Sequence, residues 1–273
     1  MTTSWIHTGY AQRIHFGEGS MARVNEVVRE VGGRRVLVIS TRGRLESEAG
    51  EELVRMLGRT VSAVYDGVRS HVPTDTVQAA LGIARDRDAD CVVSFGGGSC
   101  ADLAKAVAFF VEQEAGTPGA QYVDRPVLPH IAIPTTYSGA ELTPSFGMTD
   151  EATRRKSGGG GPTTAPIAAI YDPAVTLDTP VRVSAETGMN CLAHGVEAMW
   201  SPTASPEAAA VAAACVTRVS GALPLVVDDP GDLAARASML EGAVLGGRCL
   251  QNAGMGVHHG LAQKARPTIC SRG

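Results

Sequence analysis

Short apolar runs alternate with amphipathic segments through the first half of this 273-residue chain. Five runs, several of them rich in β-branched residues, are typical of strands: residues 10–16, 35–40, 61–65, 90–95 and 130–134. The segments between them have helical spacing: 20–31, 46–58, 74–87 and 100–112. Strands separated by helices predict βαβ units, and therefore a parallel sheet flanked by helices on both faces.

The pattern changes after about residue 155. The stretch 157–164 (SGGGGPTT) is typical of a flexible or turn-rich join. Beyond it the chain becomes rich in alanine, with helical spacing at 184–200, 206–223, 233–252 and 256–264. We therefore expect an α/β nucleotide-binding domain at 1–156, followed by an incomplete all-α domain at 157–273.

Composition narrows the classes of function. A net charge of −4 without a Lys/Arg cluster gives no sign of a nucleic-acid partner. The N-terminus has no secretory signal pattern, and no uncharged apolar run of about 18 residues predicts a membrane span, so a cytoplasmic protein is expected. Six scattered cysteines, none in a C-x-x-C pair, predict reduced and mostly buried thiols.

A glycine-rich loop gives the sharpest chemical signal. Gly96, Gly97, Gly98 and Ser99 follow a strong strand and open a helix. Glycines allow the backbone to approach a phosphate closely, and the first N–H groups of the helix then bind the anion. The loop is not the G-x-G-x-x-G fingerprint, and a tight strand–helix turn without a ligand is the alternative.

A second polar loop, PTTYSGAELT at 134–143, follows the next strand. Ligands bind at the carboxyl ends of strands in α/β folds, so its hydroxyl groups suit contacts to phosphate, ribose or nicotinamide. A polar loop without a ligand is the alternative here.

Histidines form the third signal. His194 follows Asn190 by four residues, so both side chains lie on one face of a helix. His258 and His259 come much later, after a glycine-rich segment. Asn190, His194 and His259 could contribute to a metal site, but an amide is a poor ligand and catalytic sites usually have three good ones. Helix-packing or capping histidines are the alternative.

Five motifs in this order resemble the iron-containing alcohol dehydrogenase superfamily, most closely its maleylacetate reductase branch. They are GGGSCADLAK (96–105), IPTTYSGAELT (133–143), IYDP (170–173), GMNCLAHGVEA (188–198) and NAGMGVHHGLA (252–262). The resemblance implies a nucleotide-binding α/β domain, a helical domain and an active site between them. It also implies reduction of maleylacetate to 3-oxoadipate by NADH or NADPH, in the breakdown of aromatic compounds.

The resemblance also assigns roles to residues. Gly96–Gly98 and Ser99 would hold the pyrophosphate, with Asp102 bracing the loop. Thr135, Thr136 and Thr143 would line the nicotinamide side, and Lys156 would reach the ribose. His194, His258 and His259 are the catalytic candidates. Thr41 stands where many relatives have an acid for the adenosine ribose, and Arg42 follows it. We therefore expect NADPH to be tolerated.

Departures from the family pattern set further expectations. Metal-dependent members have an aspartate at the position of Asn190, so His194 and His259 are expected to be vestigial ligands and a divalent metal is unlikely. Partners are expected to be a dicarboxylate substrate and a second copy in a homodimer, with neither nucleic acid nor membrane. Three other functions compete: a metal-dependent alcohol dehydrogenase, a lyase of the dehydroquinate synthase type, and a non-catalytic nucleotide-binding remnant.

The end of the chain is a further departure. The last motif breaks at Gln263, and KARPTICSRG is typical of a truncated or frame-shifted end. A helical domain buries its apolar faces only against its neighbours. We therefore expect partly exposed apolar side chains, self-association and little activity. The residues concerned are Met199, Trp200, Leu240, Val244 and Leu245.

Overall fold

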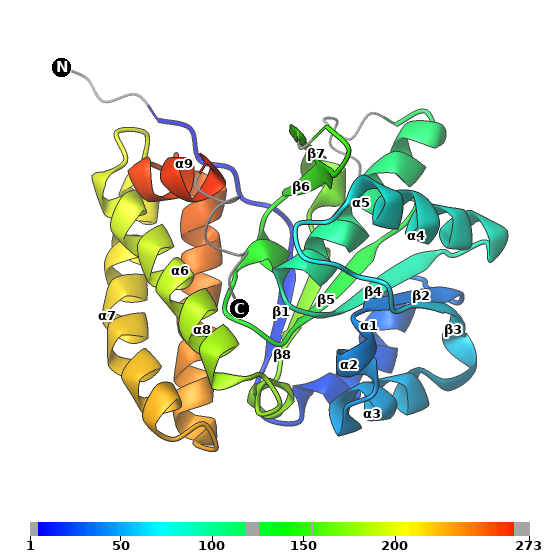
Figure 1. Cartoon of the computed structure of the whole chain (residues 1–273), viewed down its shortest axis with the longest axis horizontal. Helices are drawn as coiled ribbons and strands as arrows, with labels where there is room; N and C mark the ends of the chain where they lie inside the picture. The colour runs from blue at the N-terminus through cyan, green and yellow to red at the C-terminus, as the bar shows by residue number, and fades with distance from the viewer. Residues whose placement is uncertain (1–4, 118–125, 154, 265–273) are drawn as a thin grey trace.

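A parallel six-stranded sheet and a bundle of helices make up the part of the chain that the structure describes, residues 5–117, 126–153 and 155–264 (Figure 1). The structure is a computed structural model. The strands run in the order β1-β8-β5-β4-β2-β3. Their bounds are β1 (Arg13–Phe16), β2 (Val36–Ser40), β3 (Val61–Tyr65), β4 (Cys91–Gly96), β5 (His130–Pro134) and β8 (Ala168–Tyr171).

Helices cover both faces of this sheet, as the sequence pattern predicts. They are α1 (Val24–Glu30), α2 (Arg42–Leu45), α3 (Glu48–Leu57), α4 (Thr74–Asp86) and α5 (Gly98–Glu114). Alternate residues of β2 enter different cores: Val38 shares a cluster with Leu53 of α3, whereas Ile39 shares one with Leu103 of α5. Because both faces are buried, the strand is apolar throughout, which explains its uninterrupted hydrophobic run.

The first half of the stretch expected to be a flexible or turn-rich join, residues 157–160, is instead part of the second strand of a hairpin, and a short 3-10 turn follows at Pro162–Thr164. Strand β6 (Ser145–Asp150) pairs antiparallel with β7 (Arg155–Gly160). Glycines and charged residues have low strand propensity, so the local sequence gives no strand signal. The ladder between the two segments supplies the backbone hydrogen bonds that make them strands.

The expected domain boundary at residue 156 is too early. Strand β8 lies in the middle of the sheet and pairs with both β1 and β5. Its four residues, AAIY, are too few to show a period on their own. The α/β domain therefore extends to Tyr171, and the helical domain begins after it.

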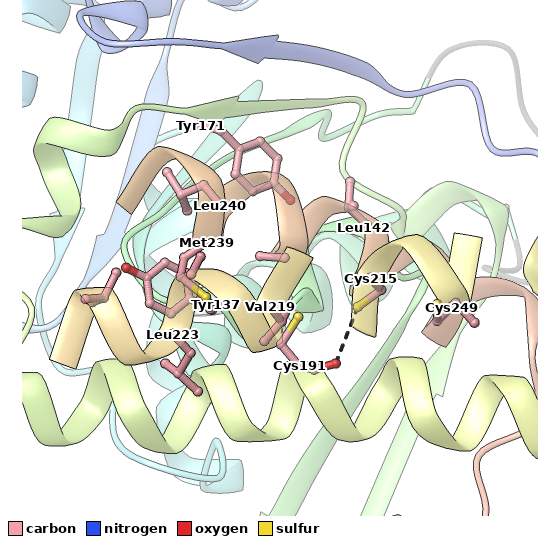
Figure 2. Close-up of a cluster of buried hydrophobic side chains, with 14 of the residues drawn as sticks. Tyr137, Leu142, Tyr171, Cys191, Cys215, Val219, Leu223, Met239, Leu240 and Cys249 are labelled. Atoms are coloured by element: carbon pink, nitrogen blue, oxygen red, sulfur yellow. Dashed lines mark hydrogen bonds between the residues drawn. The ribbon is translucent and has the colours of Figure 1, made fainter. Parts of the chain in front are cut away.

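The helical domain consists of α6 (Val181–Trp200), α7 (Pro206–Asp228), α8 (Leu233–Asn252) and α9 (Val257–Lys264). The first three pack around one apolar core, which also receives Tyr137 and Leu142 from the loop after β5 and Tyr171 from the end of β8 (Figure 2). Side chains of the α/β domain thus complete the core of the helical domain. The two domains share a packed boundary.

No membrane span was expected from the sequence, and helix α7 bears on that expectation. Within the described ranges, α7 alone is long and apolar enough to cross a membrane by length and composition. A core helix passes the same test, and α7 packs against its neighbours through Ala212, Cys215 and Val219.

The cysteines in the described ranges are all free and buried: Cys91, Cys100, Cys191, Cys215 and Cys249. This agrees with the expected reduced thiols. Cys270 lies outside the described residues, as does nearly all of the KARPTICSRG segment.

Apolar exposure follows the sequence expectation only in part. Met199 and Trp200 are 52% and 83% exposed at the end of α6. Leu240 is fully buried instead, because it faces the three-helix core, and Val244 and Leu245 are partly buried against that core.

Two glycines allow the domains to approach closely. A Cβ on Gly139 would lie 2.9 Å from Cα of Gly247, and a Cβ on Gly247 would lie 2.8 Å from Cδ1 of Leu142. Helix α8 therefore rests almost directly on the backbone of the loop after β5. This contact positions the helical domain beside the carboxyl edge of the sheet.

We expect Gly247→Ala to lower the free energy of unfolding by about 1–3 kcal/mol, because the added methyl group overpacks this contact. Gly221→Ala on α7 is the matched control, since nothing lies within 4 Å of its Cβ position. There, alanine should raise stability by up to ~1 kcal/mol through its helix propensity. Denaturant unfolding curves measure both, and a shift of the same sign in the two variants would contradict the close packing.

Candidate cofactor loop and histidine site

The glycine-rich loop connects the carboxyl end of β4 to the first turn of α5. Gly96 ends the strand and Gly98 begins the helix, with Gly97 as its N-cap. Gly96 has φ +144°, and a Cβ there would lie 2.6 Å from Sγ of Cys100. The loop therefore requires glycine at this position, and the free N–H groups of a 17-residue helix begin beside it, with Ser99 in the first turn.

Thr136 faces this loop from the neighbouring strand. The N–H of Thr135 donates to the carbonyl of Gly96 at 3.0 Å, which holds the two loops side by side. A Cβ on Gly97 would lie 3.1 Å from Cγ2 and 3.3 Å from Oγ1 of Thr136. That Oγ1 is buried and has no hydrogen-bond partner in the described part of the chain.

These features fit the pyrophosphate of a nicotinamide cofactor. A backbone that only glycine permits, helix N–H groups and an unsatisfied buried hydroxyl all converge on one place. Buried polar groups without a hydrogen-bond partner are rare in folded proteins, and such a group indicates a bound ligand or water molecule. The glycine-rich loop and Thr136 therefore fit the nicotinamide cofactor that the sequence motif predicts.

A buried lysine, which the sequence analysis did not single out, joins α5 to the second loop. Lys105 is fully buried, and its Nζ lies 2.8 Å from Oδ1 of Asp102. The same ammonium donates to the carbonyl of Ala140 at 2.8 Å and to Oγ1 of Thr143 at 3.0 Å. Asp102 is thus joined through Lys105 to the second loop, and its predicted role in bracing the glycine-rich loop remains a prediction. The sequence contained a signal for this ion pair, because Lys105 follows Asp102 by three residues inside the same motif.

Several other predicted residues already have partners within the protein. The carbonyl of Thr135 accepts from Oγ1 of Thr179 at 2.7 Å, and Thr143 holds Lys105. Lys156 lies exposed on β7, opposite Thr149 of β6. Their predicted roles on the nicotinamide side remain predictions.

Thr41 and Arg42 lie at the carboxyl end of β2. Thr41 caps α2, its Oγ1 accepting from the N–H of Arg44 at 3.3 Å. Arg42 forms an ion pair with Asp66, with 3.0 Å between Nε and Oδ2. The sequence argument treated Arg42 as an unpaired cation, and the structure places a carboxylate beside it.

His194 is buried on α6 and stays neutral. Its Nε2 lies 2.9 Å from Nδ2 of Asn190, and because an amide nitrogen can only donate, Nε2 accepts. Burial, and to a smaller extent the neighbouring His259, lower the pKa of His194 to about 3. The predicted spacing of Asn190 and His194 on one helix face is confirmed.

Glu197 is the acid that holds the second histidine segment. Its carboxylate bonds to Nδ1 of His259, and the N–H of His258 donates to Oε1 at 2.7 Å. Burial would raise the pKa of Glu197, but the hydrogen bonds and charge of His259 outweigh it, so the pKa is lowered. The sequence analysis missed Glu197, although it follows His194 by three residues on the same helix.

The three histidines lie together. The rings of His194 and His259 are stacked, with centroids 4.9 Å apart and planes 29° apart. The ring of His258 meets that of His259 edge-on at 5.1 Å. Tertiary packing therefore brings residues more than 60 positions apart into one group, as the resemblance implies.

A separate cavity lies away from this site. A hollow of about 960 Å³ is lined by Gln12, Arg13, Glu30 and Ile167, at the amino ends of β1 and β8. Ligands of open α/β sheets bind at the opposite, carboxyl edge. This hollow therefore does not belong to the site described above.

Comparison with known proteins supports the same grouping of motifs. A model of the family “Iron-containing alcohol dehydrogenase” matches residues 11–173, and one of “Fe-containing alcohol dehydrogenase family, C-terminal” matches residues 184–266. The chain belongs to the iron-containing alcohol dehydrogenase family. The two matched segments meet close to the end of β8, in agreement with the observed domain boundary.

Curated relatives in this family carry the name maleylacetate reductase. Maleylacetate reductase 2 of Cupriavidus pinatubonensis is 36% identical over 91% of this chain and 64% of its own length. Maleylacetate reductase of Sphingobium indicum is 35% identical over 94% and 67%. The chain thus spans about two thirds of the length of these relatives.

Solved structures agree with the fold. Maleylacetate reductase from Agrobacterium tumefaciens superposes with a TM-score of 0.83 at 34% identity, over 96% of this chain and 69% of that one. Sulfoacetaldehyde reductase from Bifidobacterium kashiwanohense, solved in complex with NAD+, superposes with a TM-score of 0.82 at 27% identity, over 91% and 67%. The α/β-plus-helical architecture predicted from sequence is confirmed.

Iron-containing alcohol dehydrogenases are metal enzymes by name, so the histidine group needs a test as a metal site. In the described ranges, no three His, Cys, Asp or Glu side chains are arranged to hold a metal ion. Nε2 of His194 already accepts from the amide of Asn190. Nδ1 of His259 is also engaged by Glu197. The described side chains of the histidine group therefore do not fit a bound metal ion.

We predict that Thr136→Val weakens NADH binding about three- to tenfold, since a hydrogen bond contributes about 0.5–1.5 kcal/mol. Valine has nearly the same shape, and Oγ1 has no partner in the free protein, so the unfolding free energy should not fall. Fluorescence titration and denaturant unfolding measure the two effects. Unchanged affinity would remove Thr136 from the cofactor site.

We further predict that the purified protein holds no stoichiometric iron or zinc after dialysis against a chelator. Asn190 is neutral, and one ring nitrogen each of His194 and His259 is engaged by a neighbouring side chain. Elemental analysis decides this. One tightly held metal ion per chain would contradict the prediction and favour the metal-dependent alcohol dehydrogenase alternative.

Proposed function

We propose that this protein is an NAD(P)H-dependent reductase that converts maleylacetate into 3-oxoadipate, in the breakdown of aromatic compounds. The observation that carries the proposal is the set of curated relatives named maleylacetate reductase, aligned over more than nine tenths of this chain. The histidine group supports it, because Asn190, whose amide bonds to His194, stands where the resemblance implies an aspartate in metal-dependent members.

The carboxyl edge of the sheet would hold the cofactor. Gly96, Gly97 and Gly98 would cradle its pyrophosphate, and the hydroxyl of Thr136 would donate to it. The nicotinamide supplies a hydride when bound. Lys105 holds the loop after β5 beside the glycine-rich loop, so the two loops would keep their relative positions when a ligand binds.

The histidine group would serve the substrate. When a hydride adds to a double bond conjugated with a ketone or carboxylate, negative charge develops on the substrate oxygens. Glu197 holds His259 by Nδ1, so Nε2 of that ring would stabilise the charge or deliver the proton. His194 is neutral and stacks on this ring, which limits its orientation.

We also propose a cytoplasmic enzyme that acts as a homodimer on a small dicarboxylate, without nucleic-acid or membrane partners. The net charge of −4 and the metabolic relatives support these assignments. Sedimentation of the purified chain would test the dimer.

Steady-state assays with maleylacetate and NADH test the proposal. We expect turnover in the parent and a loss of kcat of about 100-fold in Glu197→Gln, because the orientation of His259 depends on this carboxylate. The KM for NADH should change little, since Glu197 lies in the helical domain. Glu186→Gln is the matched control, an exposed glutamate of the same helix that pairs only with Arg182 in the described structure.

The outcomes separate the alternatives. Faster turnover of simple aldehydes or ketones than of maleylacetate would favour an alcohol dehydrogenase. Cofactor binding without turnover of any of these substrates would favour the non-catalytic remnant. Equal activity of Glu197→Gln and Glu186→Gln would contradict the role of His259.

A further inference from the structure

An exposed ion pair lies at the carboxyl edge of the sheet, at the ends of the two strands beyond β4. Arg42 is the first residue of α2, and Asp66 directly follows β3. Their side chains are 74% and 44% exposed, and Nε lies 3.0 Å from Oδ2. A bridge between Thr41 and Gly67 holds the two chain segments together, so the pair is set by the backbone.

The sheet order places this pair next to the phosphate loop. Strand β2 lies between β3 and β4, with Ser40 opposite Phe95, whereas β5 lies on the far side of β4, with Pro134 opposite Gly96. Neighbouring strands are only about 4.8 Å apart. A dinucleotide whose pyrophosphate rests on the loop after β4 therefore extends one end over β2 and the other over β5.

The position of the helical domain indicates which end of the dinucleotide lies over β2 and which lies over β5. Tyr137 and Leu142, from the loop after β5, lie in the helical core, and Gly139 touches Gly247 of α8. The helical domain also carries the histidine group. The reacting nicotinamide end therefore belongs on the β5 side, and the adenosine ribose belongs over β2 and β3, beside Arg42 and Asp66.

We propose that Asp66, by pairing with Arg42, makes the protein prefer NADH over NADPH. This inference rests on the proposed cofactor site. The carboxylate neutralises the cation that would otherwise attract a 2′-phosphate, and it repels that phosphate directly. A free 2′-hydroxyl can instead donate a hydrogen bond to it. Thr41 supplies no carboxylate for the adenosine ribose. Asp66, which follows the neighbouring strand β3, would supply one at the same edge of the sheet.

The assignment changes the expectation drawn from sequence. Thr41 followed by Arg42 predicts that both cofactors are accepted. With Asp66 in place, the unmodified protein should bind NADH more tightly, and removal of the carboxylate should release Arg42 to bind the phosphate.

Calorimetric titration with 5′-AMP and 2′,5′-ADP, in parallel with NADH and NADPH, tests this without depending on turnover. We expect Asp66→Asn to strengthen binding of 2′,5′-ADP and NADPH at least tenfold, while 5′-AMP and NADH change less than threefold. The double variant Asp66→Asn, Arg42→Gln should lose the gain, because the gain requires the freed guanidinium. Asp75→Asn is the matched control, an exposed acid at the start of α4 that pairs with Arg69.

The outcomes distinguish this inference from the proposed function. If the parent binds NADH but Asp66→Asn leaves the NADPH-to-NADH affinity ratio unchanged, the role of Asp66 is wrong and the cofactor site stands. A gain equal to that of Asp75→Asn would show only a general effect of net charge, and would also overturn it. If the parent binds none of the four probes, the cofactor site itself is wrong and the inference falls with it.

Discussion

A single buried ammonium group connects the parts of this molecule that have to meet. Lys105 carries no exposed surface, yet its charge is satisfied by Asp102 on its own helix and by the loop after β5. Burying a charge is costly unless it is paired and hydrogen-bonded, so the loop must stay where it supplies these groups. The glycine-rich turn and the second loop are thereby fixed relative to each other.

The helical domain depends on the same loop. Tyr137 and Leu142 extend from it into the helical core, and Gly139 allows α8 to approach its backbone (Figure 2). The histidine group on α6 and α9 is therefore positioned, through packed side chains and backbone, relative to the glycine-rich turn. A reductase needs this arrangement, because hydride transfer requires the cofactor and the proton donor to face one substrate.

The histidine group shows how one position can alter the chemistry that a family fold supports. Asn190 donates to Nε2 of His194, so the lone pair of that nitrogen is already used. The carboxylate of Glu197 instead accepts a hydrogen bond from Nδ1 of His259. Each histidine is held by a neighbour on α6, and the group forms a hydrogen-bonded cluster of side chains.

The sequence by itself determined the fold class and most of the elements. Strands such as β2 and β5 are buried on both faces, so their apolar runs are visible without a structure. The glycine-rich turn was also visible, because its backbone conformation admits no other residue at Gly96. The family motifs placed His194 and His259 in one site before any coordinates.

Tertiary structure alone decided the remainder. Strands β6 and β7 form through the ladder between them, since the glycines and charged residues of β7 have little strand preference. The four residues of β8 are too few to show a period, and their partners β1 and β5 reveal the strand. Asp66 lies beside Arg42, and Glu197 beside His259, across 24 and 62 positions of sequence. No periodicity or local spacing encodes such pairs. They exist because the sheet order and the helix packing bring distant carboxylates to the positions where a charge needs a partner.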